Sequence, residues 1–273
     1  MRVLFCGDVV GKSGRRAIDQ HLPFLKKKLK IDLAIVNGEN AASGFGFTHA
    51  ICEGFLKAGA NVITGGDHVF DKSEIFSFIG NYPSFLRPAN FPEKTPGKGF
   101  SVFETPTGAK VLVIHVLGQV FMKYQLDSPF STVDAILKNY KLGGNVKAII
   151  VDIHAEATSE KMGLAQYLDG RVSLVVGSHT HIPTADAQIF TQGTAFQCDA
   201  GMCGDYDSVI GFDPKVPLQG FIDKYRSDRM EPANGDPTLC GTFVEIDDMT
   251  GLAKKISPVR IGGRLQQHMP EVA

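Results

Sequence analysis

The sequence predicts an α/β fold in which two β-sheets pack together and helices lie outside them. Short apolar runs alternate with helix-like segments at intervals of about thirty residues, which is typical of βαβ units and a mainly parallel sheet. Near the carboxyl end, apolar and polar residues alternate as they do in the half-buried strands of a second sheet. With 273 residues, of which 43% are hydrophobic, we expect a single domain over residues 1–273 with a sizeable core.

The first part of the chain contains three predicted strands and two predicted helices. The strands are the apolar runs Arg2–Cys6, Asp32–Val36 and Asn61–Thr64. A glycine-punctuated turn at 9–14 leads into a helix from about Gly14 to Leu29, which has apolar residues at helical spacing and lysines near its end. Thr48 is a suitable N-cap for a helix through Lys57, and Gly59 closes that helix.

The remaining elements follow a segment rich in proline and glycine at 81–107, which we expect to run over the surface. Two helices are predicted beyond it, at Ser131–Tyr140 and Thr158–Leu168. The predicted strands are Lys110–Val116, Ala148–His154, Val172–Val176, Thr194–Asp199, Thr242–Ile246 and Lys255–Ile261.

Charge and cysteine content limit the partners of the chain. The 28 basic and 29 acidic residues give a net charge of -1, so no global field attracts nucleic acid or an anionic membrane, and an anionic substrate must be captured locally. Five cysteines without a CxxC pair, and an amino terminus that already forms a strand, predict a reducing cytoplasm. No apolar run approaches the roughly twenty residues that span a bilayer, so we expect no membrane partner.

Side chains that can bind metals stand at the ends of five predicted strands. Since ligands bind beyond the carboxyl ends of strands in open α/β sheets, we expect these groups to converge. His179 and His181, which are separated by one residue, would point the same way from an extended segment. Mixed nitrogen and oxygen ligands suit zinc, manganese, iron or nickel, and the set is large enough for two ions that clamp a phosphoryl group and activate a bridging water. The residues are Asp8, Glu39 with Asn40, Asp67 with His68, His154, and His179 with His181.

The motifs after the strands occur in a specific order: Gly7-Asp8, NGEN at 37–40, GGDH at 65–68, DIH at 152–154 and GSHTHIP at 177–183. In this order they resemble the calcineurin-like metallophosphoesterases and, within them, the YmdB family of bacterial phosphodiesterases, which split 2',3'-cyclic nucleotides. RPANFP at 87–92, DSPF at 127–130 and DAGMCG at 199–204 extend the similarity over most of the chain. The resemblance implies a metallophosphoesterase-type four-layer α/β/β/α sandwich of two mixed sheets.

The resemblance also implies a role for each site residue. Asp8, Glu39, Asn40 and His181 would bind a first metal ion, and Glu39 would bridge to a second ion held by Asp67, His154 and His179. A metal-bound water would attack the phosphodiester while His68 protonates the leaving oxygen. The two ions would be divalent or trivalent transition metals, iron first, with manganese or zinc as alternatives. The implied substrate is a small phosphodiester, a cyclic nucleotide or an RNA end, and we expect a homo-oligomer, either a dimer or a tetramer.

Asp67 departs from the family pattern, which usually has asparagine at this position. An aspartate offers oxygen at nearly the same reach, so metal binding should survive. Its extra negative charge should hold the second ion more tightly, weaken the Lewis acidity of that ion and repel an anionic phosphodiester. We therefore expect lowered or metal-shifted activity.

Two other functional interpretations of the sequence compete with this hypothesis. The segment CGDVVGKS at 6–13 nearly fits a phosphate-binding P-loop, but Cys6 replaces the first glycine and Asp8 would put a carboxylate in a cradle for anions. The other reading is a non-catalytic regulator that uses its metals for structure or for binding RNA. Structural metal sites are closed, whereas two ions that share Glu39 would keep water positions open.

Overall fold

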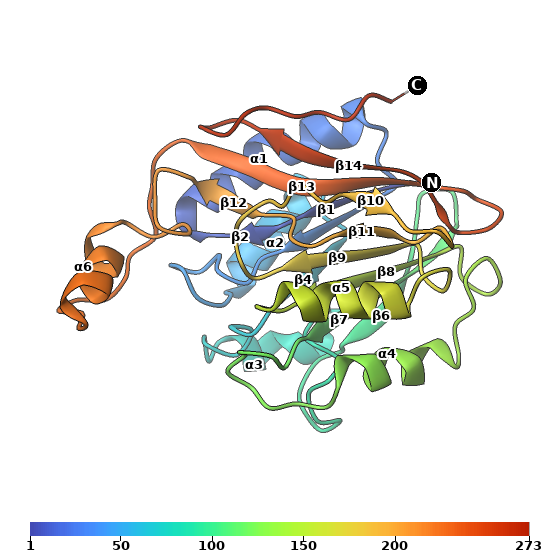
Figure 1. The fold of residues 1–273 in the computed structure, drawn as a ribbon, viewed down its shortest axis with the longest axis horizontal. Helices are drawn as coiled ribbons and strands as arrows, with labels where there is room; N and C mark the ends of the chain where they lie inside the picture. Colours follow the sequence, from blue (N-terminus) through green and yellow to red (C-terminus); the bar gives the residue numbers. More distant parts are fainter. Residues whose placement is uncertain (273) are drawn as a thin grey trace.

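The computed structural model describes residues 1–272, which form two mixed sheets between outer helices (Figure 1). The first sheet consists of β1 (Arg2–Cys6), β2 (Asp8–Val9), β3 (Leu33–Asn37), β4 (Val62–Thr64), β5 (Phe85–Leu86), β12 (Met202–Asp205), β13 (Pro237–Ile246) and β14 (Ala253–Ile261). Its strand order is β2-β12-β13-β1-β3-β4-β5, with β14 beside β13. The β1, β3, β4 and β5 strands are parallel, whereas β13 runs antiparallel to β1.

The second sheet has the order β10-β11-β9-β8-β7-β6. From β6 to β11 its strands are Phe100–Glu104, Lys110–Leu117, Ala148–His154, Leu174–Ser178, Gln188–Ile189 and Ala195–Gln197. The four inner strands are parallel, and β6 and β10 pair antiparallel at the two edges. The parallel strands β8 and β9 therefore end at the same edge of this sheet.

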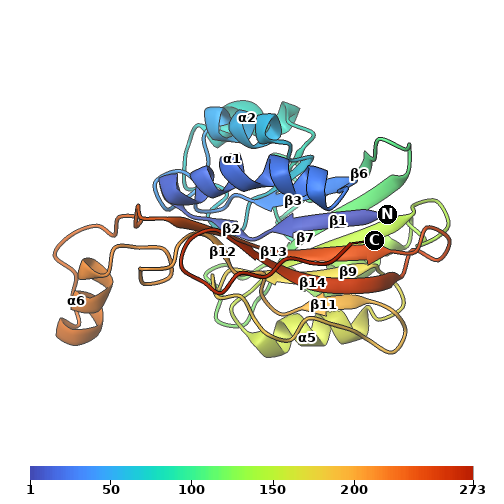
Figure 2. The same ribbon diagram turned by 90° about the horizontal axis from the view of Figure 1, so that it is seen from above.

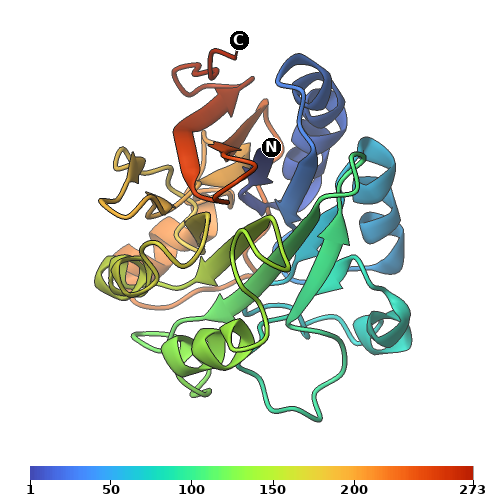
Figure 3. The same ribbon diagram turned by 90° about the vertical axis from the view of Figure 1, so that its right-hand side faces the viewer.

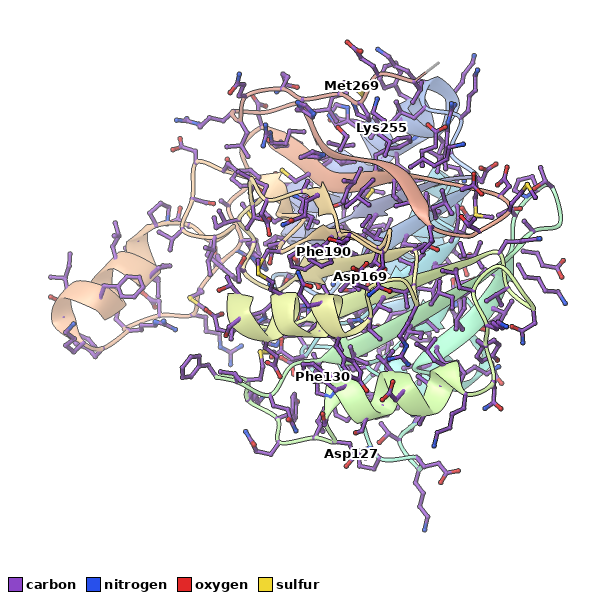
Figure 4. All side chains as sticks on the ribbon, turned by 45° about the vertical axis from the view of Figure 1, so that its right-hand side comes forward. Asp127, Phe130, Asp169, Phe190, Lys255 and Met269 are labelled. Carbon is purple, nitrogen blue, oxygen red and sulfur yellow. The ribbon has the colours of Figure 1, made fainter. Side chains whose placement is uncertain are left out.

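The helices form two outer layers, as seen from above in Figure 2 and from the side in Figure 3. The helices α1 (Gly11–Lys28) and α2 (His49–Ala58) cover the first sheet, while α4 (Pro129–Leu137) and α5 (Thr158–Tyr167) cover the second. Phe130 of α4, which is labelled in Figure 4, packs against Tyr167 at the end of α5. Their ring centroids are 5.6 Å apart. The short α3 (Ile75–Phe78) and η1 (Ile79–Asn81) follow β4, and α6 (Lys215–Asp223) projects from the body. Among the described residues, no helix is long and apolar enough to cross a membrane.

Alternate residues of the central strands enter different cores. Leu4 and Cys6 of β1 pack beneath α1 and α2, whereas Val3 and Phe5 pack between the two sheets. A third core lies between the second sheet and α4 and α5. Since both faces of these strands are buried, their sequences read as continuous apolar runs. The predicted four-layer α/β/β/α sandwich of two mixed sheets is confirmed.

The first helix begins earlier than predicted. It starts at Gly11, so the expected turn up to Gly14 is instead the first turn of α1. Gly14 is inside the helix because the helix lies directly against β12: a Cβ atom on Gly14 would come 2.2 Å from the carbonyl oxygen of Cys203. The glycine therefore permits close packing and does not mark a turn.

Several strands also differ from the sequence prediction. The runs near the carboxyl end, β13 and β14, were expected in the second sheet but belong to the first, where β13 pairs with β1. The segment 81–107 contains β5 and β6 at the sheet edges and is not simply an excursion. Such assignments depend on which distant strand offers free backbone groups, which local alternation does not reveal. By contrast, β8 and the Thr48-capped α2, closed by Gly59 at φ 109°, follow the prediction.

Candidate metal centre

The predicted ligands converge where the two sheets meet. The strands β2, β3 and β4 deliver ligands from the first sheet, and β8 and β9 deliver them from the second. Two groups form, each with its ligand atoms within 4.8 Å of one another, and both contain Glu39. One group is Asp8, Glu39 and His181, and the other is Glu39, Asp67, His154 and His179.

Asn40 joins the first group by its contact with His181. The Nε2 atom of His181 lies 3.1 Å from Oδ1 of Asn40, whose amide nitrogen donates to the Gly44 carbonyl and so directs this oxygen inward. On the other side of the ring, Nδ1 of His181 donates to the carbonyl of Ile210 at 2.7 Å. This hydrogen bond fixes the tautomer and leaves Nε2 free as a ligand.

The second group brings two imidazoles together edge to face: the rings of His154 and His179 lie 4.8 Å apart between centroids, at an interplanar angle of 74°. The Nε2 atom of His154 is 2.9 Å from Glu39 Oε1 and 3.2 Å from Asp67 Oδ1. His179 presents Nδ1 to the same point, 3.1 Å from His154 Nε2, while its Nε2 faces Glu156 at 3.3 Å. Glu156 therefore orients His179 from the solvent side.

A buried hydrogen-bond relay fixes the orientation of His154. The hydroxyl of Ser178 donates to Asp152 Oδ1 at 2.8 Å, so its oxygen is free to accept from Nδ1 of His154 at 2.9 Å. Asn37 donates a further hydrogen bond to Ser178 at 3.1 Å. The relay keeps the proton of His154 on Nδ1 and points Nε2 at Glu39 and Asp67, as is usual for a metal-binding histidine.

Replacing Ser178 by Ala should weaken the second group without dispersing it. We expect metal affinity to fall by about 10- to 100-fold and the free energy of unfolding to fall by about 1–3 kcal/mol, because His154 loses its orienting acceptor. Competition with a chelator measures the affinity. Ser173→Ala is the matched control, since Ser173 is also buried and accepts a hydrogen bond from Ile149, but it contacts no ligand. Equal loss of affinity in the two variants would contradict the role of the relay.

The loop after β4 is held against Glu39 by backbone hydrogen bonds. The amides of Asp67 and His68 donate to Glu39 Oε1 at 2.8 and 3.1 Å. Gly66, at φ 55°, makes this approach possible, because a Cβ atom there would lie 2.4 Å from the Glu39 carboxyl carbon. The Gly66 amide donates to Nε2 of His115, whose Nδ1 lies 3.1 Å from Asp152. Asp152 therefore positions both His154 and the loop that carries Asp67.

The buried charges of the cluster perturb one another. Burial raises the pKa of Glu39 well above its ordinary value, although the neighbouring His154 opposes this effect. Burial also acts to raise the pKa of Asp67, but hydrogen bonds with His154 and His179 outweigh it and hold that pKa below its usual range. Burial alone would lower the pKa of His154, yet Glu39 and Asp67 raise it well above normal. The cluster thus retains protons that a bound cation would displace.

The donor set suits transition metal ions. It combines carboxylate and amide oxygens with imidazole nitrogens, the mixture expected for zinc, manganese or iron. Asp8 supplies a further indication: its Oδ2 accepts from the His179 amide at 3.1 Å, but its buried Oδ1 has no hydrogen-bond partner among the described residues. A buried carboxylate oxygen without a donor is costly unless a cation compensates it.

His68 lies beside the two ligand groups and is about one quarter exposed. Its Nδ1 is 2.7 Å from Oδ2 of Asp71, and its ring meets the ring of Phe45 edge-on at 4.9 Å between centroids. These contacts fix the ring and leave Nε2 available. A histidine held in this way can give a proton to a departing oxygen.

The two histidines of the GSHTHIP motif do not follow an extended path. His179 has φ 98° and His181 has φ 68°, so both occupy the left-handed region, which is strained for residues other than glycine. The expectation that a period of two would align them is therefore wrong, and they face different groups.

Asp199 holds the loop that carries the two histidines. It accepts hydrogen bonds from the amide and the hydroxyl of Thr180 at 3.0 and 2.7 Å, and it forms a buried ion pair with Lys161 at 2.8 Å.

Comparison with known proteins agrees with this architecture. Residues 4–259 match the family described as YmdB-like protein. The chain belongs to the YmdB-like family. A relative from Bacillus subtilis strain 168, named 2',3'-cyclic-nucleotide 2'-phosphodiesterase, is 44% identical over 261 residues, which are 96% of this chain and 97% of the relative.

Two solved structures resemble this YmdB-like chain over almost its full length. A hypothetical protein from Thermus thermophilus aligns with a TM-score of 0.89 and 39% identity, covering 97% of this chain and all of the other. A structure described as a novel phosphatase from Mycoplasma pneumoniae has a TM-score of 0.89 and 34% identity, with 96% and 93% covered. The two-sheet arrangement is therefore that of its relatives.

The sequence predicted no roles for the residues around the candidate ligands. Asp152 could have been noticed, because a carboxylate inside the apolar run of β8 requires a buried partner. Asp71 and Glu156 follow His68 and His154 closely in sequence, but only their contacts reveal their roles. The P-loop alternative is wrong: Asp8 and Val9 form a strand, α1 begins at Gly11, and Asp8 belongs to a ligand group.

Proposed function

We propose that this YmdB-like protein is a binuclear metal-dependent phosphodiesterase that hydrolyses 2',3'-cyclic nucleotides. The observation that carries the proposal is the pair of ligand groups that share Glu39, with His68 beside them. The name of the Bacillus subtilis relative supports a 2',3'-cyclic nucleotide as the substrate. Membership of the YmdB-like family and the relatives named as phosphodiesterases or phosphatases support a hydrolase.

Asp8, Asn40 and His181 would hold one ion, Asp67, His154 and His179 would hold the other, and Glu39 would contact both. We propose iron, with manganese or zinc as alternatives, because the oxygen and nitrogen donors suit this class. When bound, the ions supply Lewis acidity and lower the pKa of a coordinated water. The protein itself fixes the ligand orientations through Ser178 and the Ile210 carbonyl.

His68 would act as the general acid. Its backbone amide donates to Glu39, and its Nδ1 donates to Asp71, so in the imidazolium form the proton on Nε2 is the one available for transfer. The oxygen that leaves a ribose phosphodiester is a poor leaving group and must be protonated as it departs. Phe45 restricts the ring from one side.

Metal analysis combined with turnover tests this function. Protein purified without oxygen is expected to contain about two transition metal ions per chain and to hydrolyse 2',3'-cyclic AMP after defined reconstitution with iron, manganese or zinc. A single ion per chain at full activity would overturn the binuclear proposal. Fully loaded protein that turns over no phosphodiester would favour a non-catalytic regulator instead.

The variant Asp67→Asn tests the effect of aspartate at a position where the family usually has asparagine. We expect the neutral amide to weaken retention of one ion and to raise kcat by about tenfold at saturating metal, since each 1.4 kcal/mol of electrostatic change corresponds to a factor of ten. Metal content and turnover are measured together on the same preparations. Asp248→Asn serves as the control, because it removes an exposed carboxylate in the turn between β13 and β14 that belongs to neither ligand group. Unchanged metal content and turnover in Asp67→Asn would refute the idea.

We further propose that the protein works in the cytoplasm as a single-domain homo-oligomer, a dimer or a tetramer. The described cysteines are all free and buried, which suits a reducing compartment. The projecting α6 segment exposes Phe221 and Ile222, which a second copy could cover. Its substrates would include RNA ends as well as free cyclic nucleotides.

A further inference from the structure

A large basic cavity lies next to the candidate metal centre. Its volume is about 770 Å³, within the usual range of small-molecule sites. Five cationic side chains line it against two acidic ones, Asp228 and Glu231, although the whole chain has a net charge of -1. The cationic residues are Lys12, Arg15, Lys72, Arg226 and Arg229.

These cations are only partly neutralised by neighbouring groups, since Asp19, one helical turn after Arg15, acts on the charge of that side chain. Among the ion pairs of residues 1–272, none involves any of the five. Arg15 donates to the carbonyl of Ala41, which keeps its guanidinium at the cavity without cancelling its charge. Lys12 stands in the first turn of α1, a helix start that has no acidic residue and no side-chain cap. The helix dipole therefore adds positive potential on the same side.

The cavity and the metal centre share a wall. Phe45 lines the cavity and touches the His68 ring. Lys72 follows Asp71, the residue that holds His68. The Gly11 amide donates to the carbonyl of Asn40 at 2.9 Å, and Lys12, which lines the cavity, comes next in the chain. An anion in this cavity would thus lie beside both the proton donor and the ligands.

We propose that this cavity binds a second phosphate group of the substrate, on the 5' side of the scissile phosphodiester. The proposal rests on the proposed function and narrows it to nucleotides that carry a further phosphate. Such a phosphate occurs in a 5'-phosphorylated cyclic nucleotide and at the internucleotide linkage of an oligoribonucleotide with a 2',3'-cyclic end. A concave site whose five cations outnumber its two acidic groups matches a compact phosphate, which lysine and arginine bind through charge and hydrogen bonds.

Substrate comparison tests the proposal. We expect kcat/KM to rise by about tenfold from 2',3'-cyclic AMP to its 5'-phosphorylated form and to the dinucleotide ApA with a 2',3'-cyclic end, because exposed charge pairs contribute modestly in water. If both gain, the phosphate alone suffices. A gain by the dinucleotide alone would assign the effect to the added nucleoside and contradict the proposal. Equal kcat/KM values for all three substrates would overturn the proposal.

A double variant shows whether the cavity is responsible. Lys12→Gln with Arg229→Gln is expected to reduce the ratio of kcat/KM between the dinucleotide and the mononucleotide to near one. Lys27→Gln with Lys28→Gln is the matched control, since it removes equal charge from the far end of α1, about 20 Å away along the helix. A ratio that stays the same in the first variant, or falls equally in both, would contradict the assignment.

Direct binding separates this proposal from the proposed function. By calorimetry, the 3'-phosphorylated dinucleotide ApAp should bind about tenfold more tightly than 3'-AMP, and raised salt should reduce this difference. Preference for ApAp in a protein that hydrolyses nothing would sustain the phosphate site and reject the enzyme. Hydrolysis of 2',3'-cyclic AMP by a protein that binds ApAp no better than 3'-AMP would support the enzyme and reject the phosphate site.

Discussion

Replacing Glu39 by Gln is expected to lower kcat/KM for 2',3'-cyclic AMP by at least about a thousandfold, because the one carboxylate common to both ligand groups is lost. Glutamine keeps the size of the side chain and can still accept from the Asp67 and His68 amides. The fold should therefore persist while metal content falls. Metal analysis, circular dichroism and turnover of the same preparation check these three expectations.

The control for Glu39→Gln is Glu104→Gln, an exposed carboxylate on β6. It should leave metal content and turnover as they are in the unmodified protein. If Glu39→Gln retained two ions and full activity, Glu39 would not be the shared ligand, and the two groups would have to bind independently.

Replacing His68 by Asn is expected to reduce hydrolysis of 2',3'-cyclic AMP by about 10²- to 10⁴-fold, the usual contribution of a general acid. A p-nitrophenyl phosphodiester should lose far less activity, because p-nitrophenolate departs without a proton. Metal content should stay constant, since His68 belongs to neither ligand group. Comparison of the two substrates distinguishes loss of a proton donor from damage to the metal centre.

His49→Asn is the matched control for His68→Asn, because His49 is an exposed histidine on α2. Its replacement should affect neither substrate. Equal losses on both substrates in His68→Asn would assign His68 to phosphate binding or to metal retention instead of proton transfer.

The local sequence was sufficient to predict most of the strands and helices. The buried strands β1, β3 and β8 are mainly apolar runs, and the capping residues Thr48 and Gly59 delimit α2. These signals are local: they depend on neighbouring residues and on backbone preferences. The position of β13 and β14 in the first sheet could not be found in this way, because it depends on pairing with β1, more than two hundred residues away.

The sequence by itself determined which residue types follow the strands, and therefore the kind of chemistry to expect from Asp8, Glu39, His154 and His179. Only the tertiary structure decided how these residues are grouped. The candidate ligands come from two different sheets, and the left-handed backbone of His179 and His181 directs their rings to different groups. The relay from Asp152 through Ser178 depends on the pairing of β8 with β9, and the shared position of Glu39 depends on distances between the two sheets. No sequence spacing encodes such distances.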